Sequence, residues 1–585
     1  MRTVPRPLVA AATACAVALL ASTACDGGAD AADLVLRNGT IITLDSAVPE
    51  ATALAARDGR IVAVGSDEEI SRHIGGRTEV IDLDGATAVP GFIEGHGHFM
   101  SLGRARMMLD LTTARRWSDI VAQVGAAVGD AGTDRWIVGR GWHQEKWDEV
   151  PEGAVEQLPT HHALSAVSPN NPVLLTHASG HAAFANARAL QLAGITRETP
   201  NPPGGEIVRD REGNPTGALR ERAQIAVREA MSSANADRRP EDADAEARLA
   251  VELAGEDLLS KGITSFHDAG ATFSDIDFFR RLADEGQLPV RLYVMVRRAS
   301  NEEMERRLPE YRIIGAGNDY LTVRSIKRQI DGALGPHGAW LLQPYDDMRT
   351  STGLVLEPVA DIERTAEIAI QHGFQLNTHA IGDRGNREVL DIYERVFSKH
   401  PDATDLRWRI EHAQHLHPDD VPRFARLGVI AAMQGIHATS DAPWVYRRLG
   451  ARRAESGAYL WRSLIDAGVV IANGTDVPVE NADPIASYYA SVSRRLEDGS
   501  VFFPGQRMTR EEALRSYTIN NAYAAFEEES KGTLSPGKLA DIAVLSQNIL
   551  TVDENRIPET RVLYTIVGGQ VRHRADGAPG GVTRR

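Results

Sequence analysis

Short apolar runs alternate with helical patterns through the middle of the chain. Eight apolar runs fit β-strands, at residues 87–93, 262–266, 290–295, 323–327, 374–379, 408–412, 429–433 and 469–473. Helical patterns, such as residues 245–259 and 362–372, lie between most of them. Eight β/α repeats predict an α/β fold, the TIM (β/α)8 barrel, whose chemistry lies at the carboxyl ends of its strands. An open doubly wound sheet is the alternative, but the chain lacks the glycine fingerprint that binds phosphate in that fold.

Both ends of the chain are rich in short strand patterns. Asn38-Gly39 separates two β-rich runs, which is a strong hairpin signal. Neither end alone has enough strands for a core, so we expect the two ends to pair into one small β-sandwich domain. The predicted units are a β-sandwich from residues 33–88 and 531–573, a barrel over residues 89–530, and a flexible tail over residues 574–585.

The connection between the first and second predicted strands is unusually long. About 160 residues separate them, far more than one crossover helix needs. We therefore expect an inserted subdomain, from about residue 111 to residue 223, that caps the barrel rim and shapes substrate choice. Three residues of the insertion, and one that follows the seventh strand, are candidates for substrate contact: Trp142, His143, His181 and His437. The alternative for each is packing or support of other residues.

The first residues resemble an export signal rather than part of the fold. Two arginines precede an apolar run from Leu8 to Ala21, which is too short to span a bilayer as a mature helix. Small residues then precede Cys25, as in bacterial lipoprotein signals. We expect residues 1–24 to be a lipoprotein-type signal peptide, Cys25 to carry the lipid, and residues 25–32 to form a tether. The protein would then be anchored at the bacterial cell envelope, or secreted if the signal is an ordinary one.

Charge narrows the range of partners. The formal net charge of -16 argues against a nucleic-acid partner. We expect a small-molecule substrate, and we expect contact with a membrane only through the lipid on Cys25. A homodimer is possible. Six of the 64 basic residues are lysines, so a lysine inside a predicted strand stands out.

Titratable residues gather at the ends of the predicted strands. His96 and His98 are two positions apart, so a strand directs them to one face, where two neutral imidazoles can bind a metal. Four further residues end other predicted strands: Lys327, His379, His412 and Asp476. Any one of these has an ordinary reading, such as a hydrogen-bonding histidine or a loop-capping aspartate. Their concentration at one rim predicts a metal site.

The sequence around these residues is similar to that of a known family. Four segments resemble the amidohydrolase 3 family of the amidohydrolase superfamily, the YtcJ-like and N-substituted formamide deformylase-like proteins: Lys327–Gly335, His379–Asp383, Arg409–Gln414 and Lys531–Asp541. The chain departs from the family pattern at Gly435, where we expect proline.

The resemblance implies a metal-dependent hydrolase with one or two zinc ions, two being favoured. One ion would be held by His96, His98 and Asp476, and the other by His379 and His412. Lys327, carboxylated by carbon dioxide, would bridge them. A buried lysine readily loses its charge and can react with carbon dioxide, whereas arginine remains protonated. Two alternatives stay open for Lys327: a salt bridge to Asp331, or a single-metal site with the lysine unmodified.

The leading function is hydrolysis of a carbon–nitrogen bond in a non-peptide amide or N-formyl amine. Metal-activated hydroxide would attack, and Asp476 would be both ligand and acid–base. A cyclic amidase, a deaminase or an esterase on the same metal centre is an alternative, as is a non-catalytic metal- or solute-binding lipoprotein. We expect Glu411, next to His412, to face away from the site because neighbouring strand residues alternate.

Overall fold

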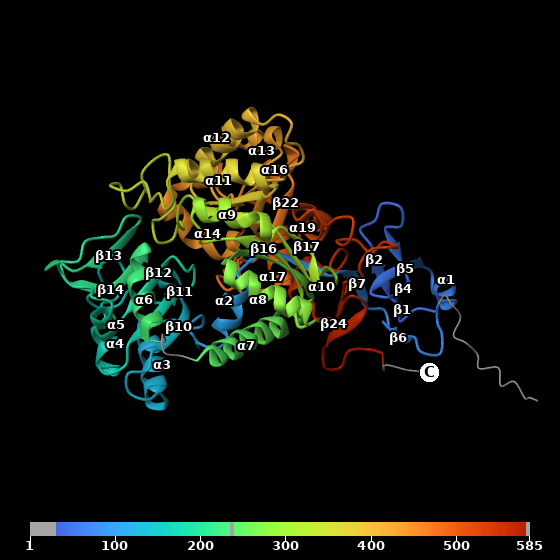
Figure 1. Cartoon of the computed structure of the whole chain (residues 1–585), viewed down its shortest axis with the longest axis horizontal. Coiled ribbons are helices and arrows are strands. Elements are labelled where there is room, and N and C mark those ends of the chain that lie inside the picture. The colour runs from blue at the N-terminus through green and yellow to red at the C-terminus, as the bar shows by residue number, and fades with distance from the viewer. Residues whose placement is uncertain (1–30, 235–238, 581–585) are drawn as a thin grey trace, which may run out of the picture.

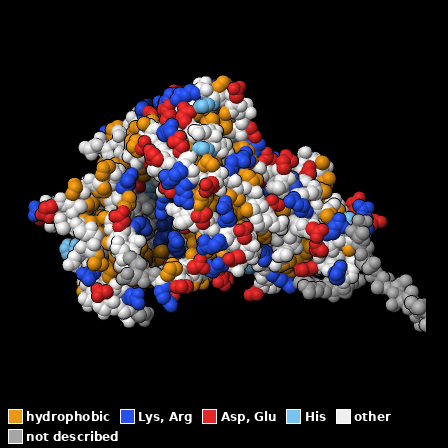
Figure 2. All heavy atoms as spheres, in the orientation of Figure 1, with side chains coloured by type: hydrophobic (Ala, Val, Ile, Leu, Met, Phe, Trp, Pro, Cys, Tyr) orange, Lys and Arg blue, Asp and Glu red, His pale blue; other side chains and the backbone are white. Residues whose placement is uncertain are grey.

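A computed structural model describes residues 31–234 and 239–580 of the chain (Figure 1). The barrel occupies the centre, the inserted subdomain lies at one end, and the β-sandwich lies at the other (Figure 1). The predicted signal peptide, Cys25 and most of the predicted tether lie outside the described residues. On the face drawn in Figure 2, acidic and basic side chains are interspersed.

Eight parallel strands form the barrel and follow one another in the order of the chain. They are β8 (Phe92–Gly97), β15 (Ile263–Ala271), β16 (Arg291–Val296), β18 (Leu321–Gln329), β19 (Gln375–Ala380), β20 (Arg409–His412), β21 (Ile430–Gln434) and β22 (Ile471–Gly474). Each pairs in parallel with the next, from β8 to β22. Every predicted run overlaps one of these strands, so the predicted TIM barrel is confirmed.

Amphipathic helices cover the outside of the barrel. The longer ones are α7 (Pro240–Leu259), α8 (Phe273–Asp284), α9 (Asn301–Tyr311), α11 (Val359–His372), α12 (Asp383–Lys399), α14 (Gly435–Leu449) and α17 (Pro484–Ser493). In α12, Val389, Ile392 and Val396 recur at the spacing of one helix face and are all buried. These faces and the outward side chains of the strands share one large apolar core.

The barrel closes where β22 meets β8. The Asn521 carboxamide donates to the carbonyl oxygens of Ile93, at 2.7 Å, and Asn473, at 2.8 Å, and so bridges the two strands. A β-carbon on Gly474 would lie 2.3 Å from Oε1 of Glu94, so this approach requires glycine. The close seam brings the residues that follow β22 next to the HxH pair of β8.

The β-sandwich is built from both ends of the chain, as predicted. Its first sheet has the order β5-β4-β1-β6, and its second the order β25-β24-β23-β7-β2-β3. The bounds are β1 (Leu34–Arg37), β2 (Thr40–Ile42), β3 (Glu50–Ala51), β4 (Ala53–Arg57), β5 (Arg60–Gly65), β6 (Glu79–Asp82), β7 (Thr87–Pro90), β23 (Ile542–Leu545), β24 (Val562–Val567) and β25 (Gln570–Arg574). In the second sheet β23 pairs antiparallel with β7, so strands from the two ends share one ladder. The two sheets enclose a common apolar core.

Two expectations at the edges of this domain need correction. The single run predicted over residues 87–93 divides at Gly91, because β7 belongs to the sandwich and β8 to the barrel. Residues 574–580 were predicted to begin a flexible tail, but they pack on the sandwich. Ala578 is buried in its core, and the Tyr564 hydroxyl donates to the Gly580 carbonyl at 3.1 Å.

The insertion has its own six-stranded sheet, in the order β13-β14-β12-β11-β10-β9. Its strands are β9 (Leu109–Asp110), β10 (Ile137–Trp142), β11 (Val173–His177), β12 (Ala182–Ala185), β13 (Gly205–Arg209) and β14 (Pro215–Glu221). Apolar side chains of α3 (Trp117–Asp130) and α4 (His162–Val167) belong to one core, and those of α5 (Ala187–Leu192) and α6 (Ile225–Ala234) to another. Among the described residues, we find no helix with both the length and the apolar character to cross a bilayer.

Candidate metal centre

The carboxyl ends of the barrel strands gather the six predicted ligands into one cluster. Ligand atoms of His96, His412 and Asp476 all lie within 4.8 Å of one another, and the three residues are buried. The Nε2 atoms of His98 and His96 lie 3.2 Å and 3.6 Å from Oδ1 of Asp476. The cluster thus joins residues from β8, from β20 and from the turn after β22.

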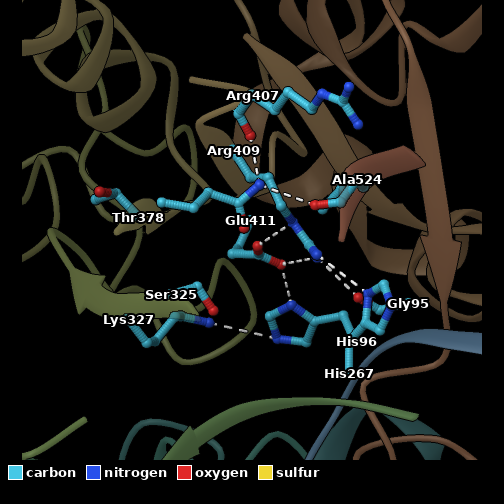
Figure 3. Close-up of polar contacts among 12 residues, drawn as sticks. Gly95, His96, His267, Ser325, Lys327, Thr378, Arg407, Arg409, Glu411 and Ala524 are labelled. Carbon is cyan, nitrogen blue, oxygen red and sulfur yellow. Dashed lines mark hydrogen bonds and ion pairs between the residues drawn. The ribbon is translucent and has the colours of Figure 1, made fainter. Parts of the chain in front are cut away.

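The other two predicted ligands adjoin this group. The His379 ring lies beside that of His412, with ring centroids 4.4 Å apart. Nζ of Lys327 lies 3.4 Å from Nε2 of His96 (Figure 3). All six predicted ligands therefore meet at one place, although they come from five strands or strand ends.

Glu411 faces into the barrel, and the expectation that it faces away is wrong. Its carboxylate accepts a hydrogen bond from Nδ1 of His96 (Figure 3). Strict alternation would then point His412 outward, but His412 has a φ of 75° and the next residue, Ala413, a φ of 42°. These left-handed conformations, which non-glycine residues rarely adopt, break the alternation at the strand end. Glu411 and His412 can therefore both serve the site.

Arg409 holds Glu411 from the other side. Its Nε lies 2.7 Å from Oε1 of Glu411, and its Nη2 donates to Oε2 at 3.1 Å and to the Gly95 carbonyl at 2.7 Å (Figure 3). Burial alone would raise the pKa of Glu411, but the Arg409 guanidinium and His96 hold it well below its usual range. An ionised Glu411 that accepts the Nδ1 proton of His96 leaves Nε2 of that ring free to bind a cation.

The remaining donors fit a divalent transition metal. Nδ1 of His412 lies 2.8 Å from Oε1 of Gln434, which fixes the ring and leaves its Nε2 toward the cluster. Two buried atoms in the cluster, Nε2 of His379 and Oδ1 of Asp476, have no hydrogen-bond partner among the described residues. Oδ1 of Asp476 instead faces the Nε2 atoms of His98 and His96, and Nε2 of His379 lies 3.5 Å from Oδ1 of Asp331. Imidazole nitrogens and a carboxylate oxygen gathered in this way are the ligand set that zinc prefers.

Lys327 is buried beside these imidazoles. Only 2% of its surface is exposed, and burial, aided by Arg297 and Arg409, lowers its pKa to about 7. Asp331 was the predicted alternative partner, but no ion pair among the described residues joins the two side chains. Asp331 instead accepts backbone N–H groups of three residues in nearby loops, Trp340, Ile381 and Gly382, at 2.8, 3.0 and 2.8 Å.

A cavity of about 60 Å³ opens over the cluster, between the barrel and the insertion. Three of the predicted substrate contacts line it: His143, His181 and His437. Trp142 does not line this cavity, so the prediction that it contacts substrate is corrected. That indole is 1% exposed, donates to the Leu175 carbonyl at 2.9 Å, and packs in the core of the insertion. Sequence reasoning missed other lining residues, among them Lys146, His177, Asp441, Trp444 and Glu480.

Comparison with known proteins identifies the family. A profile of the amidohydrolase family, the type 3 group that the motifs predicted, matches residues 79–573. The chain belongs to the amidohydrolase 3 family. Protein LONG AFTER FAR-RED 3 of Arabidopsis thaliana is 33% identical over 553 residues, which are 92% of this chain and 91% of that protein. N-substituted formamide deformylase of Arthrobacter pascens is 30% identical over 555 residues, 93% of this chain and 99% of that protein.

Solved structures agree with this assignment. An uncharacterized metal-dependent hydrolase from Pyrococcus horikoshii OT3 is 26% identical and superposes with a TM-score of 0.70, over 89% of this chain and 99% of that one. The chain is thus an amidohydrolase with a cluster of residues that can bind a metal, and its relatives indicate hydrolase activity.

The departure at Gly435 has a local cause in this amidohydrolase. The Gly435 amide donates to Oδ1 of Asn473 at 2.9 Å, a hydrogen bond that proline cannot make. A β-carbon at this position would also lie 2.3 Å from Oγ of Ser491. Gly435 therefore lets α14 begin close to the barrel seam.

Proposed function

We propose that this amidohydrolase cleaves the carbon–nitrogen bond of a small non-peptide amide or N-formyl amine, using one or two zinc ions. The observation that carries the proposal is the meeting of His96, His412 and Asp476 beneath a small cavity, with Lys327 beside them. The relative named N-substituted formamide deformylase, similar over nearly the whole chain, supports the choice of bond.

The predicted ligands would bind two ions. His96, His98 and Asp476 would hold one ion, and His379 and His412 the second. When bound, such ions lower the pKa of a coordinated water and polarise a carbonyl group.

Asp476 is suited to move the proton. Burial alone would raise the pKa of Asp476, but His98 and His96 hold it well below its usual range, so the carboxylate is ionised at neutral pH. We infer that the Asp476 carboxylate takes a proton from the attacking water and delivers it to the nitrogen of the leaving amine.

Lys327 would contribute as a carbamate. A pKa of about 7 leaves much of the amine uncharged near neutral pH, and an uncharged amine attacks carbon dioxide and releases one proton. The product is an anionic group with two oxygens, which suits a position between two cations. The alternative of an unmodified lysine beside a single ion gives the same ligand cluster without this bridge.

The test is hydrolysis of a panel of N-formyl and N-acetyl amines by zinc-loaded protein. Asp476→Asn should lower kcat by about 10²- to 10⁴-fold while the fold and much of the bound metal remain, because only the proton carrier is lost. Asp498→Asn, in an exposed loop, is the matched control and should behave as wild type. Metal uptake by the wild type without turnover of any substrate in the panel would favour the non-catalytic alternative. Normal turnover by Asp476→Asn would overturn the acid–base assignment.

A further inference from the structure

The insertion brings a hydrogen-bonded pair, His181 and Glu221, to the edge of the metal cluster. Nδ1 of His181 lies 3.0 Å and 2.9 Å from the two carboxylate oxygens of Glu221. The residues flank adjacent antiparallel strands, His181 just before β12 and Glu221 at the end of β14, and the Glu221 amide donates to the His181 carbonyl at 2.8 Å. The pair is therefore fixed by the sheet of the insertion.

A loop of the barrel encloses the carboxylate of this pair. A β-carbon on Gly332 would lie 2.2 Å from Oε1 of Glu221, and one on Gly338 would lie 2.5 Å from the same atom. The two glycines are joined by a hydrogen bond of 3.0 Å from the Gly332 amide to the Gly338 carbonyl. They form a slot in the loop that follows β18, the strand of Lys327. The insertion thus docks a carboxylate into the barrel.

Glu221 shows two further signs of a specialised position. Its φ of 49° lies in the left-handed region, which a non-glycine residue adopts only with backbone strain. Its side chain is 5% exposed, and His181 is its only ion-pair partner among the described residues. Burying a carboxylate in a strained backbone with one imidazole as its partner costs stability. We therefore expect this pairing to have a role in the site.

The rest of the His181 ring faces the site. Its centroid lies 5.5 Å from that of His379, and the residue lines the same cavity as His379, His412 and Asp476. Since Glu221 engages Nδ1, the Nε2 edge is the part of the ring left for a ligand. The His181 side chain is 15% exposed, and this exposure opens toward the cavity.

We propose that His181 is a catalytic residue supplied by the insertion, which donates a hydrogen bond from Nε2 to the carbonyl oxygen of the scissile amide, and that Glu221 is the residue that positions it. This inference rests on the proposed amide hydrolysis. Negative charge grows on the carbonyl oxygen as water attacks, so a donor fixed in advance stabilises the transition state more than the substrate. Both carboxylate oxygens of Glu221 lie beside Nδ1 of His181, so this carboxylate supplies the counter-charge for a ring that carries a proton on each nitrogen.

Kinetics of four variants test the roles. His181→Ala should lower kcat about 10²- to 10³-fold, as loss of one such donor does elsewhere, with KM and metal content little changed. His181→Gln, which keeps an N–H donor, should recover part of that loss, and Glu221→Gln should lose about tenfold through misplacement of the ring. Glu206→Gln is the matched control, because Glu206 lies in the same sheet but pairs with Arg220. Wild-type kcat in His181→Ala, or no recovery in His181→Gln, would overturn the inference.

A binding measurement separates this inference from the proposed function. Acetohydroxamate presents a carbonyl oxygen to the zinc-loaded protein and serves here as a ligand, and calorimetry measures its Kd. His181→Ala should weaken binding at least tenfold, and Gly332→Ala, whose methyl group would displace the Glu221 carboxylate, should weaken it too. If the wild type hydrolyses no amide, the proposed function fails, while the hydroxamate affinities still decide the role of His181. Equal affinities in wild type, His181→Ala and Gly332→Ala would refute it.

Discussion

Lys327 is a residue whose ionisation depends strongly on its surroundings. Burial in the barrel interior disfavours the charged form of its amine and so lowers its pKa, and Arg297 and Arg409 add to this effect. Glu411 and Asp476 oppose it. Because the charged amine is destabilised here, the uncharged amine is favoured. The uncharged amine is the form that can react with carbon dioxide or lie beside a metal ion. Stability and function therefore pull in opposite directions at this position.

Replacing Lys327 by methionine should stabilise the metal-free protein. The pKa of Lys327 falls from 10.5 to about 7 on folding. The cost of burying the charge is therefore fully present below pH 7 and is relieved between pH 7 and about 10.4, where only the unfolded chain is protonated. Urea unfolding should show Lys327→Met more stable than wild type at pH 7, by a margin that shrinks by pH 9.5. Lys399→Met, at a half-exposed site, should change little at either pH. A margin that grows with pH would refute the assignment.

Glu411 should act through His96 on metal affinity. In Glu411→Gln the neutral amide is a weaker acceptor for the Nδ1 proton and leaves Arg409 without its counter-charge. We expect zinc to bind about 10- to 100-fold more weakly, with the fold retained, as competition with a fluorescent chelator would measure. Glu303→Gln, in a surface pair with Arg307, is the control. Unchanged affinity in Glu411→Gln would mean that His96 needs no carboxylate to orient it.

At the scale of elements, the seam between β8 and β22 decides whether a ligand cluster forms. Seven pairs of neighbouring barrel strands are joined by parallel ladders. The eighth contact, between β22 and β8, relies on Asn521, Glu94 and Gly474. Oε1 of Glu94 accepts the Thr475 amide at 2.6 Å, one residue before Asp476. The seam thus sets the position of Asp476 relative to the HxH pair.

Gly474→Ala should open this seam. The new methyl group would meet Oε1 of Glu94 at 2.3 Å and the backbone nitrogen of His96 at 2.5 Å, and the backbone cannot yield without separating the strands. We expect a loss of several degrees in Tm, of the size that overpacking by 1–3 kcal/mol produces, together with weaker zinc binding. Gly76→Ala, where nothing lies within 4 Å, should leave both quantities unchanged. A wild-type Tm in Gly474→Ala would show that the seam is looser than described.

Element by element, the sequence was a good guide where a local pattern decides the structure. Apolar runs predicted all eight barrel strands, and their polar ends predicted the ligand positions, because strand periodicity and parallel pairing are regular. The sequence did not predict side-chain positions that depend on a single backbone torsion or on a tertiary contact. The left-handed turn at His412 lets Glu411 and His412 both face the site, and burial of Trp142 in the insertion removes it from the cavity. Glu221 carried no signal, since its role depends on a loop more than a hundred residues away.

At the scale of the whole molecule, each of the three structural units has a different role. The barrel supplies the cluster, and the insertion lines part of the cavity over it. The β-sandwich, at the opposite end of the molecule from the insertion, joins the two ends of the chain through β7 and β23 (Figure 1). Because the second sheet of the sandwich needs strands from both ends, it can be completed only after the whole chain has been synthesised. Sequence patterns indicated the three units, but not that Ala578 and its neighbours complete the sandwich core.

We also propose that Cys25 anchors the whole molecule in the envelope. Its sequence context is the support, and it lies outside the described residues. Expressed in bacteria with radiolabelled palmitate, the wild type should incorporate label and partition into detergent, and Cys25→Ala should do neither. Cys15→Ala is the matched control, because Cys15 would be removed with the signal peptide. Equal labelling of wild type and Cys25→Ala, or none in either, would contradict the anchor and leave secretion as the interpretation.

Anomalous diffraction at the zinc edge, from crystals of zinc-loaded protein, tests the central claim most directly. The account predicts one or two strong peaks at about 2.0–2.2 Å from nitrogen and oxygen atoms of His96, His412 and Asp476. With two peaks, added density on Lys327 should lie between them. Zinc bound elsewhere while this cluster stays empty, or a Lys327 side chain directed away from the peaks, would contradict it.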